Sequence, residues 1–328
     1  MNKTTFILGV DVSKLTLDVH CPERGKHVKI SNSTEGFKEL HRWCRLHQID
    51  LEDTMVALEY TGGYEYRLLQ HLEAKKIRYV RIPGLAIKRS LGIVRGKTDK
   101  VDAARIARYG RINQEDLKEG CLNENILKLK ELISFRKRLV RDRAADEATL
   151  GEREHMKGVS KKDLINRGLA QRIKATSKLL EQVEAAIEDL ISKDEALDCN
   201  FRLLTSIRGI GQVNAWMTIA YTENFTAFTD PRKYAVYVGV VPFENSSGTS
   251  IGGKKRVSKL ANKELKAELD CAARSAIAWD PEIKEYVKRK NNKPYKLLKN
   301  NVKFKLILRM FAIVKKGKPY VDNYQKAA

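Results

Sequence analysis

The sequence predicts an α/β domain at the N-terminus, then a helical linker, then a mainly α-helical C-terminal part. Three observations predict this order. Short apolar runs alternate with helical patterns over residues 1–115, residues 116–197 carry apolar side chains at heptad-like spacing, and residues 198–328 show helical patterns separated by glycine turns. A chain of 328 residues can bury more than one core, so we expect two or three modules.

The elements of the first domain follow from its apolar runs. Residues 6–11 and 55–59 read as buried strands that each end in an acid, and residues 15–19 alternate as a half-buried neighbouring strand would. A third buried strand is expected at residues 77–82, before Pro83 and Gly84. Helical spacing predicts a helix that begins at residues 33–35 and another around residue 69.

Four acids in this domain form a candidate metal site. Asp11 and Glu59 end two predicted strands, and the carboxyl ends of strands in an open α/β sheet point into the usual ligand crevice. Asp99 and Asp102 stand three residues apart in KTDKVDA, which predicts a first helical turn with both acids on one face. Four oxygen donors without Cys or His favour Mg²⁺ or Mn²⁺, the ions used in phosphoryl transfer.

A simpler interpretation of the same acids stays open at this point. KTDKVDA can be a capped helix start in which Asp102 pairs with Arg105, and Asp11 and Glu59 can be solvated strand ends. The basic charge of the whole chain favours the metal site over this interpretation.

Composition points to a polyanionic partner. The net charge is +22, and residues 201–328 carry 25 Lys or Arg against 10 Asp or Glu. Such a surplus attracts nucleic acid, with the C-terminal part as the main candidate. No apolar run approaches the roughly 20 residues of a membrane span, and no signal-peptide pattern opens the chain, so we expect no membrane partner and a cytoplasmic protein. The five cysteines lack a CxxC and are expected to be reduced packing residues.

Residues 116–197 predict two long helices. Apolar residues fall nearly on an a/d pattern with dense charge between them, as in ILKLKELISF and LLEQVEAAIEDL. Breaks are expected near residues 157–160 and 167–168. An antiparallel hairpin, an intermolecular coiled coil and an ordinary helical linker all fit this pattern.

The C-terminal part opens on a glycine-rich turn. Helical patterns flank SIRGIG, with Arg208, Gly209 and Gly211 in the turn, as in a helix-hairpin-helix element whose backbone N–H groups approach a phosphate. A plain tight turn between two helices is the alternative.

A loop of small residues follows after residue 238. GVVPFENSSGTSIGG precedes the cations Lys254, Lys255, Arg256 and Lys259, so a hydroxyl and a backbone could lie close to a phosphodiester. The alternative is a flexible surface loop. Further helical spacing runs from residue 258 to a break at Trp279, Asp280 and Pro281, and the basic tail beyond it carries aromatic side chains that suit a nucleic-acid face or a core.

These residues together carry a resemblance to a known family. GVDVSK, ALEYTGGY, KTDKVDA, SIRGIG and GVVP followed by SSGTSIGGKKRVSK resemble, in the same order, the motifs of DEDD-type transposases of bacterial insertion sequences. That family includes Piv-type DNA invertases and bridge-RNA-guided recombinases. The resemblance covers nearly the whole chain, and KTDKVDA is its most specific motif.

The resemblance implies a RuvC-like, ribonuclease-H-type α/β domain at 1–115, a coiled-coil helical linker at 116–197, and a mainly α transposase domain at 198–328. It implies that Asp11, Glu59, Asp99 and Asp102 are the metal-binding, catalytic tetrad. It also implies a nucleophilic serine in the small-residue loop, Ser247, with Ser246 as an alternative. The nucleic-acid-binding residues expected are Arg208, Gly209 and Gly211 in the glycine turn, and Lys254, Lys255, Arg256 and Lys259 near the serine loop.

The implied reaction is cutting and rejoining of double-stranded donor and target DNA through a phosphoserine intermediate, with Mg²⁺ or Mn²⁺ as cofactor. The implied partners are a noncoding guide RNA and further copies of the chain, as a dimer of dimers that shares active sites. The protein would then work in the bacterial cytoplasm, associated with the nucleoid.

Three other classes of protein fit parts of the sequence. A junction-resolving nuclease would use the same tetrad with water as the nucleophile. A sugar kinase or actin-like ATPase also begins with a strand, Gly and Asp, but it would be longer and does not explain the basic charge. A non-enzymatic helix-hairpin-helix protein explains the charge but leaves the four acids without a role.

Overall fold

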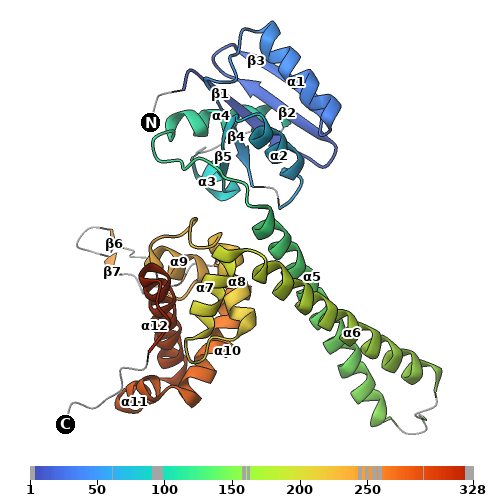
Figure 1. The fold of residues 1–328 in the computed structure, drawn as a ribbon, viewed down its shortest axis with the longest axis vertical. Helices are drawn as coiled ribbons and strands as arrows, with labels where there is room; N and C mark the ends of the chain where they lie inside the picture. Colours follow the sequence, from blue (N-terminus) through green and yellow to red (C-terminus); the bar gives the residue numbers. More distant parts are fainter. Residues whose placement is uncertain are drawn as a thin grey trace. The chain divides into compact units, whose positions relative to one another are not determined.

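The computed structural model describes residues 4–60, 62–90, 99–156, 160, 163–242, 246–247, 251–252, 257, 261–290 and 292–321. The chain divides into two compact units, Met1–Leu122 and Asn123–Ala328 (Figure 1). Each unit has its own apolar core.

The first unit is built on a mixed five-stranded sheet, which confirms the predicted α/β domain. The strand order is β3-β2-β1-β4-β5, with β1, β2 and β3 antiparallel and β1, β4 and β5 parallel. The elements in chain order are β1 (Phe6–Val12), β2 (Thr16–Cys21), β3 (Lys26–Ser31), α1 (Thr34–Leu46), β4 (Thr54–Glu59), α2 (Tyr66–Ala74), β5 (Arg78–Ile82), α3 (Gly84–Ser90) and α4 (Asp99–Ile112).

Helices cover both faces of this sheet (Figure 1). Alternate residues of β1 point to opposite faces, so Leu8 and Val10 pack in the core under α1 and α2, whereas Ile7 packs under α3 and α4. Helix α1 begins where the sequence predicts, because the Ser33 side chain accepts a hydrogen bond from the Gly36 backbone N–H. Two separate apolar clusters therefore pack on the two faces of the sheet.

Helix α4 approaches β1 more closely than ordinary side chains would allow. Gly9 on β1 faces the backbone of α4, and a Cβ atom at this position would overlap the Ala103 carbonyl and the Ala107 backbone nitrogen. Ala103 and Ala107 are completely buried at the contact. This contact of small residues fixes the distance between the helix and the strand that carry the predicted acids.

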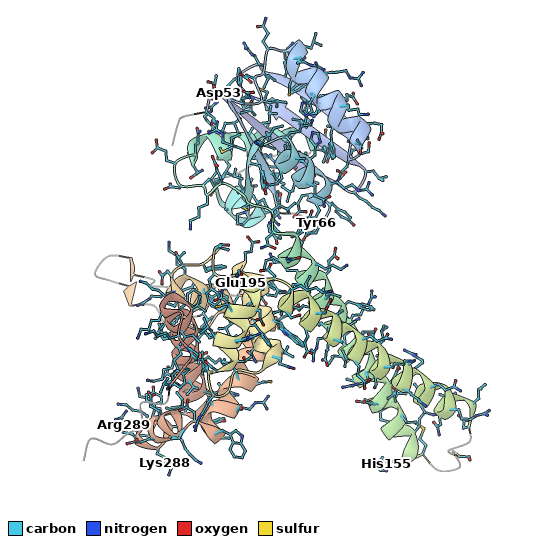
Figure 2. The ribbon with its side chains drawn as sticks, viewed as in Figure 1. Asp53, Tyr66, His155, Glu195, Lys288 and Arg289 are labelled. Atoms are coloured by element: carbon cyan, nitrogen blue, oxygen red, sulfur yellow. The ribbon has the colours of Figure 1, made fainter. Side chains whose placement is uncertain are left out.

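The second unit is helical apart from one short hairpin, among the residues that the structure describes. Its elements are α5 (Glu124–Glu154), α6 (Leu164–Ser192), α7 (Glu195–Thr205), α8 (Gln212–Thr222), α9 (Pro231–Val238), β6 (Ser246–Ser247), β7 (Ile251–Gly252), α10 (Lys263–Trp279), α11 (Pro281–Arg289) and α12 (Tyr295–Lys316). Side chains from α5 and α6 join the same core as the C-terminal helices. Figure 2 shows exposed Lys288 and Arg289 in the last turn of α11.

The long helices α5 and α6 pack against each other as a hairpin within one chain (Figure 1). The predicted break at residues 167–168 is wrong, because α6 runs without interruption from Leu164 to Ser192. Asp163 caps the helix by accepting from the Ile165 N–H, and one glycine inside a long packed helix costs only ~1 kcal/mol. Of the break expected at residues 157–160, only Ser160 is among the described residues.

The structure bears on two predictions from composition, one about the cysteines and one about membrane spans. All five cysteines are free, but only Cys21 and Cys44 are buried, so the packing role predicted for all of them is wrong for Cys121, Cys199 and Cys271. In the described ranges, no helix combines the length and the apolar character needed to cross a membrane.

The α4 contact generates a test of the fold. Replacing Gly9 by Ala should lower the free energy of unfolding by about 1–3 kcal/mol, because the added methyl group forces α4 away from β1. Gly151→Ala is a matched control, since a Cβ there meets nothing within 4 Å, and it should leave stability equal or slightly higher. Thermal unfolding measures both, and an unchanged Gly9→Ala midpoint would show that the contact is looser than described.

Candidate active site

The sheet brings Asp11 and Glu59 to the same edge. Strands β1 and β4 are parallel and adjacent, with Val10 opposite Leu58, so the next residue of each strand is one of the two acids. Both acids therefore lie where β1 and β4 end, as the sequence predicts.

Helix α4 adds the second pair of acids. Asp99 and Asp102 stand in its first turn, and α4 packs against β1 and β2. The Asp11 carboxyl is half-buried there, and its pKa is raised from 3.8 to about 6. Burial is the largest cause, followed by the negative charges of Asp102, Asp99, Glu59 and Asp18. The four predicted acids therefore share one electrostatic environment.

Basic side chains hold two of these acids. The Arg105 guanidinium bonds the Asp102 carboxylate at 2.8 Å, which is the ion pair expected from the simpler interpretation of the sequence. The Lys29 ammonium lies 3.4 Å from the Asp99 carboxylate. Glu59 instead rests against Gly84, where a larger residue would overlap its carboxylate. Both the ion pair and the clustering of acids are thus present.

The four carboxylates are suitable ligands for a divalent cation, although they are not arranged around a common point. Within the described ranges, no three His, Cys, Asp or Glu side chains form a ready metal site. Four carboxylates are the ligands that Mg²⁺ and Mn²⁺ prefer, and the pKa of Asp11 is raised first by burial and then by the negative charges of the other acids.

Sequence reasoning missed three residues beside the acids. Asp18 on β2 pairs with Asp11 across the sheet, and its buried carboxylate accepts from His27 at 2.9 Å and Lys29 at 3.2 Å. Apolar and polar residues alternate in LDVH and KHVKI, which places these three side chains on the sheet face under α4. This alternation was the sequence signal that could have identified them. The signal was missed because β3 is polar and was not predicted as a strand.

The predicted nucleophile region belongs to the second unit. Ser246 and Ser247 form β6, which pairs antiparallel with β7 so that Ser247 lies opposite Ile251. The predicted phosphate-binding cations Lys254, Lys255, Arg256 and Lys259 lie outside the described residues. Their assignment stays a prediction.

The glycine turn at residues 206–211 joins α7 and α8, so the predicted helix-turn-helix order is present. Gly209 has φ +93° and packs so tightly on α10 that a Cβ would lie 2.8 Å from that of Ala276. Arg208 is exposed, and Gly211 caps α8. Packing alone explains Gly209, so the phosphate-binding role of Arg208, Gly209 and Gly211 stays a prediction.

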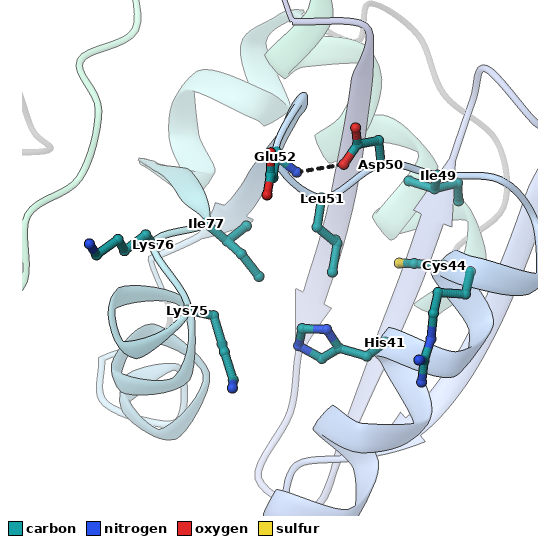
Figure 3. A pocket seen from close by; sticks show the side chains of 10 residues that line it. His41, Cys44, Ile49, Asp50, Leu51, Glu52, Lys75, Lys76 and Ile77 are labelled. Atoms are coloured by element: carbon teal, nitrogen blue, oxygen red, sulfur yellow. Dashed lines mark hydrogen bonds between the residues drawn. The ribbon is translucent and has the colours of Figure 1, made fainter.

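A separate pocket of about 530 Å³ is lined by α1 and by the segments that follow α1 and α2 (Figure 3). His41 and Cys44 of α1 line it together with Lys75, Lys76 and Ile77, which follow α2. None of the tetrad acids lines this pocket. It is therefore not the candidate active site.

Comparisons with known proteins find matches in two stretches of the chain. Residues 8–161 match a DEDD-type family model described as a transposase, and residues 201–288 match a model described as the transposase IS116/IS110/IS902 family. The chain is 25% identical over 334 residues to the pilin gene-inverting proteins of Moraxella lacunata and Moraxella bovis, covering 98% of each chain. It is also 27% identical over 132 residues to an uncharacterized protein of insertion element IS110 from Streptomyces coelicolor, covering 40% of this chain and 31% of that one.

The raised pKa of Asp11 predicts an unusual response to mutation. A carboxyl group with a raised folded pKa binds its proton more tightly when folded, so the metal-free protein loses stability as the pH rises from about 4 through about 6. Asp11→Asn should remove this loss and raise the free energy of unfolding at pH 7.5 by ~1 kcal/mol, allowing for solvent screening. Denaturant unfolding in EDTA at pH 5 and pH 7.5 measures the effect.

Asp53 offers a control of opposite sign. Asp53 directly precedes Thr54, the first residue of β4 (Figure 2), and hydrogen bonds from the side chain and the backbone N–H of Thr5 lower its pKa. Asp53→Asn should therefore reduce stability at pH 7.5. If Asp11→Asn also lowers the free energy of unfolding at pH 7.5 in EDTA, burial and the neighbouring acids do not destabilise the Asp11 carboxylate as described.

Proposed function

This chain belongs to the IS110 family of DEDD transposases, and on that premise we propose that it cuts and rejoins two DNA duplexes through a phosphoserine intermediate under the guidance of a noncoding RNA. Family membership makes it a phosphoryl-transfer enzyme that acts on DNA. The observation that supports the proposal most is the clustering of Asp11, Glu59, Asp99 and Asp102 at one edge of the sheet.

The tetrad would hold the cofactor and orient the phosphodiester. A bound Mg²⁺ or Mn²⁺ ion would polarise the scissile phosphate and offset the charge that develops on its oxygens. Asp11 and Glu59 lie on neighbouring parallel strands, and Asp99 and Asp102 lie in the first turn of α4. The rigid sheet thus sets the position of the site, and the helix completes it.

The Ser247 hydroxyl is the proposed nucleophile, with Ser246 as the alternative. Its oxygen bonds to phosphorus as the bond from phosphorus to the leaving sugar oxygen breaks, while the serine proton passes to a base and the leaving oxygen is protonated. One phosphoester replaces another, so the bond energy is kept for rejoining to a new strand. Lys254, Lys255, Arg256 and Lys259 are the proposed partners of the phosphate charge.

The partners follow from charge and from the relatives. The basic excess of residues 201–328 suits double-stranded DNA and a guide RNA, whose pairing with donor and target DNA would supply sequence specificity. The Moraxella relatives are named for gene inversion, so inversion between two sites is a reaction that this chain could also perform. We propose that it acts as a dimer of dimers on the bacterial nucleoid, with active sites shared between copies.

A junction-resolving nuclease is the second candidate. One observation favours it: the four acids belong to the first compact unit, whereas Ser246 and Ser247 belong to the second. The acids could therefore serve hydrolysis by water without any serine. A covalent DNA adduct separates the two candidates.

The serine mechanism predicts a trapped adduct. The full chain, expressed with the DNA that flanks its gene, should carry covalently attached DNA after lysis in denaturant. Ser247→Ala should reduce the adduct at least ~100-fold, because the attacking oxygen is gone. Ser246→Ala is the matched control on the neighbouring residue and should keep it.

Other outcomes have defined meanings. An adduct lost only in Ser246→Ala transfers the role to that residue. No adduct in any protein, together with Mg²⁺-dependent nicking that Asp102→Asn abolishes, would establish the nuclease instead.

RNA guidance predicts a separate result. A noncoding RNA from the flanking DNA should co-purify with the wild-type chain, and ribonuclease treatment before DNA is added should abolish strand exchange. Changing the RNA bases that pair with the target should redirect it to a matching sequence. Strand exchange that survives complete RNA digestion would rule out guidance.

A further inference from the structure

Lys29 connects Asp18 with the predicted tetrad. It lies on β3, and its ammonium lies 3.2 Å from an Asp18 oxygen and 3.4 Å from an Asp99 oxygen. Its charge therefore lies at the edge of the acid cluster. Any role for Lys29 in catalysis rests on the proposed phosphoryl-transfer function, in which a group besides the tetrad has to meet the phosphate charge.

Asp18 anchors this lysine and is not a further metal ligand. Its side chain is only 7% exposed, and its two oxygens are both engaged, one by His27 at 2.9 Å and the other by Lys29. A buried carboxylate with two partners stays in place and holds its partners in turn. Strand pairing supports this arrangement, because Asp18 lies directly opposite Lys29 between β2 and β3.

Asp99 is the less firmly held of the two acid partners of Lys29. Its side chain is 65% exposed, against 7% for Asp18, and it stands at the first residue of α4. An ammonium has three donors, and half of the Lys29 side chain is exposed to solvent. If Asp99 turns toward a metal ion, Lys29 keeps its bond to Asp18 and has donors available for another anion.

We propose that Lys29 is a catalytic residue that contacts a non-bridging oxygen of the scissile phosphodiester, held there by Asp18 as a positioning residue. In the free protein Lys29 neutralises Asp99. In the complex the phosphate oxygen takes the place of Asp99, so the ammonium exchanges one anion for another and stays protonated. Its charge then opposes the negative charge that builds up on the phosphate during attack, whichever nucleophile is used.

A purely structural Lys29 would behave differently. If the lysine only offsets repulsion among the acids, its removal weakens metal binding and changes nothing at the phosphate. If it contacts the phosphate and competes with the metal ion for Asp99, its removal leaves metal binding equal or tighter and slows the chemical step. These opposite signs make the two roles separable.

The experiment compares Lys29→Ala, Lys29→Arg and Asp18→Asn with the wild-type chain. Lys26→Ala is the matched control, because Lys26 is an exposed lysine on the same strand with its side chain on the other face. Circular dichroism confirms folding. Three quantities are measured: Mn²⁺ affinity without DNA, the single-turnover rate of phosphodiester cleavage at saturating Mg²⁺, and protection of Lys29 from reductive methylation by bound DNA with Ca²⁺ in place of Mg²⁺.

The proposal predicts a set of linked results. Lys29→Ala should cut the cleavage rate about 100-fold, as loss of an oxyanion-stabilising donor does, with Mn²⁺ affinity equal or higher. Lys29→Arg should recover most of the rate, and Asp18→Asn should resemble Lys29→Ala because the anchor is lost. Bound DNA should protect Lys29 but not Lys26.

Two results would overturn it. Lys29→Ala that weakens Mn²⁺ binding as Asp99→Asn does would make Lys29 a support for the metal ligand. Lys29 that stays fully modifiable when DNA is bound would show that it does not meet the phosphate. Failure of the proposed serine chemistry looks different, since the wild-type chain would then form no adduct while methylation and Mn²⁺ binding still report on Lys29.

Discussion

The close contact of α4 with β1 is the constraint on which the first unit depends. Gly9 and Ala107 let the helix backbone lie directly on the strand, so Asp99 and Asp102 approach Asp11, which follows Gly9 by two residues. The packing that excludes a single methyl group thereby also brings like charges together. Tight packing of small residues supplies the stability that the repulsion among the acids removes.

Much of this arrangement could be predicted from the sequence. The buried strands that end in Asp11 and Glu59 are strongly apolar runs, and such runs identify both the strand and the end at which its acid lies. KTDKVDA likewise predicts the first turn of α4. The local sequence pattern was sufficient here because each acid belongs to a strand or helix whose apolar residues recur at a regular spacing.

The remainder depends on contacts that no local pattern encodes. Strand β3 is largely exposed and polar, and it exists because pairing with β2 satisfies its backbone, so Lys29 could not be placed beside Asp99 from the sequence. Gly168 shows the converse error, since hairpin packing of α6 overrides a residue that would weaken an isolated helix. In both cases, contacts between elements determined the local structure.

The basic residues around the tetrad explain how the acids can fold together before any cation binds. Arg105 pairs with Asp102, and Lys29 pairs with Asp99, while Asp11 is left with its pKa raised. The two neutralised acids are the ones on the helix, and the strand acids are fixed by the sheet. A site balanced in this way folds without a metal ion at a modest cost. It also keeps two positive side chains next to the four carboxylates, the proposed site for a phosphodiester, which is itself an anion.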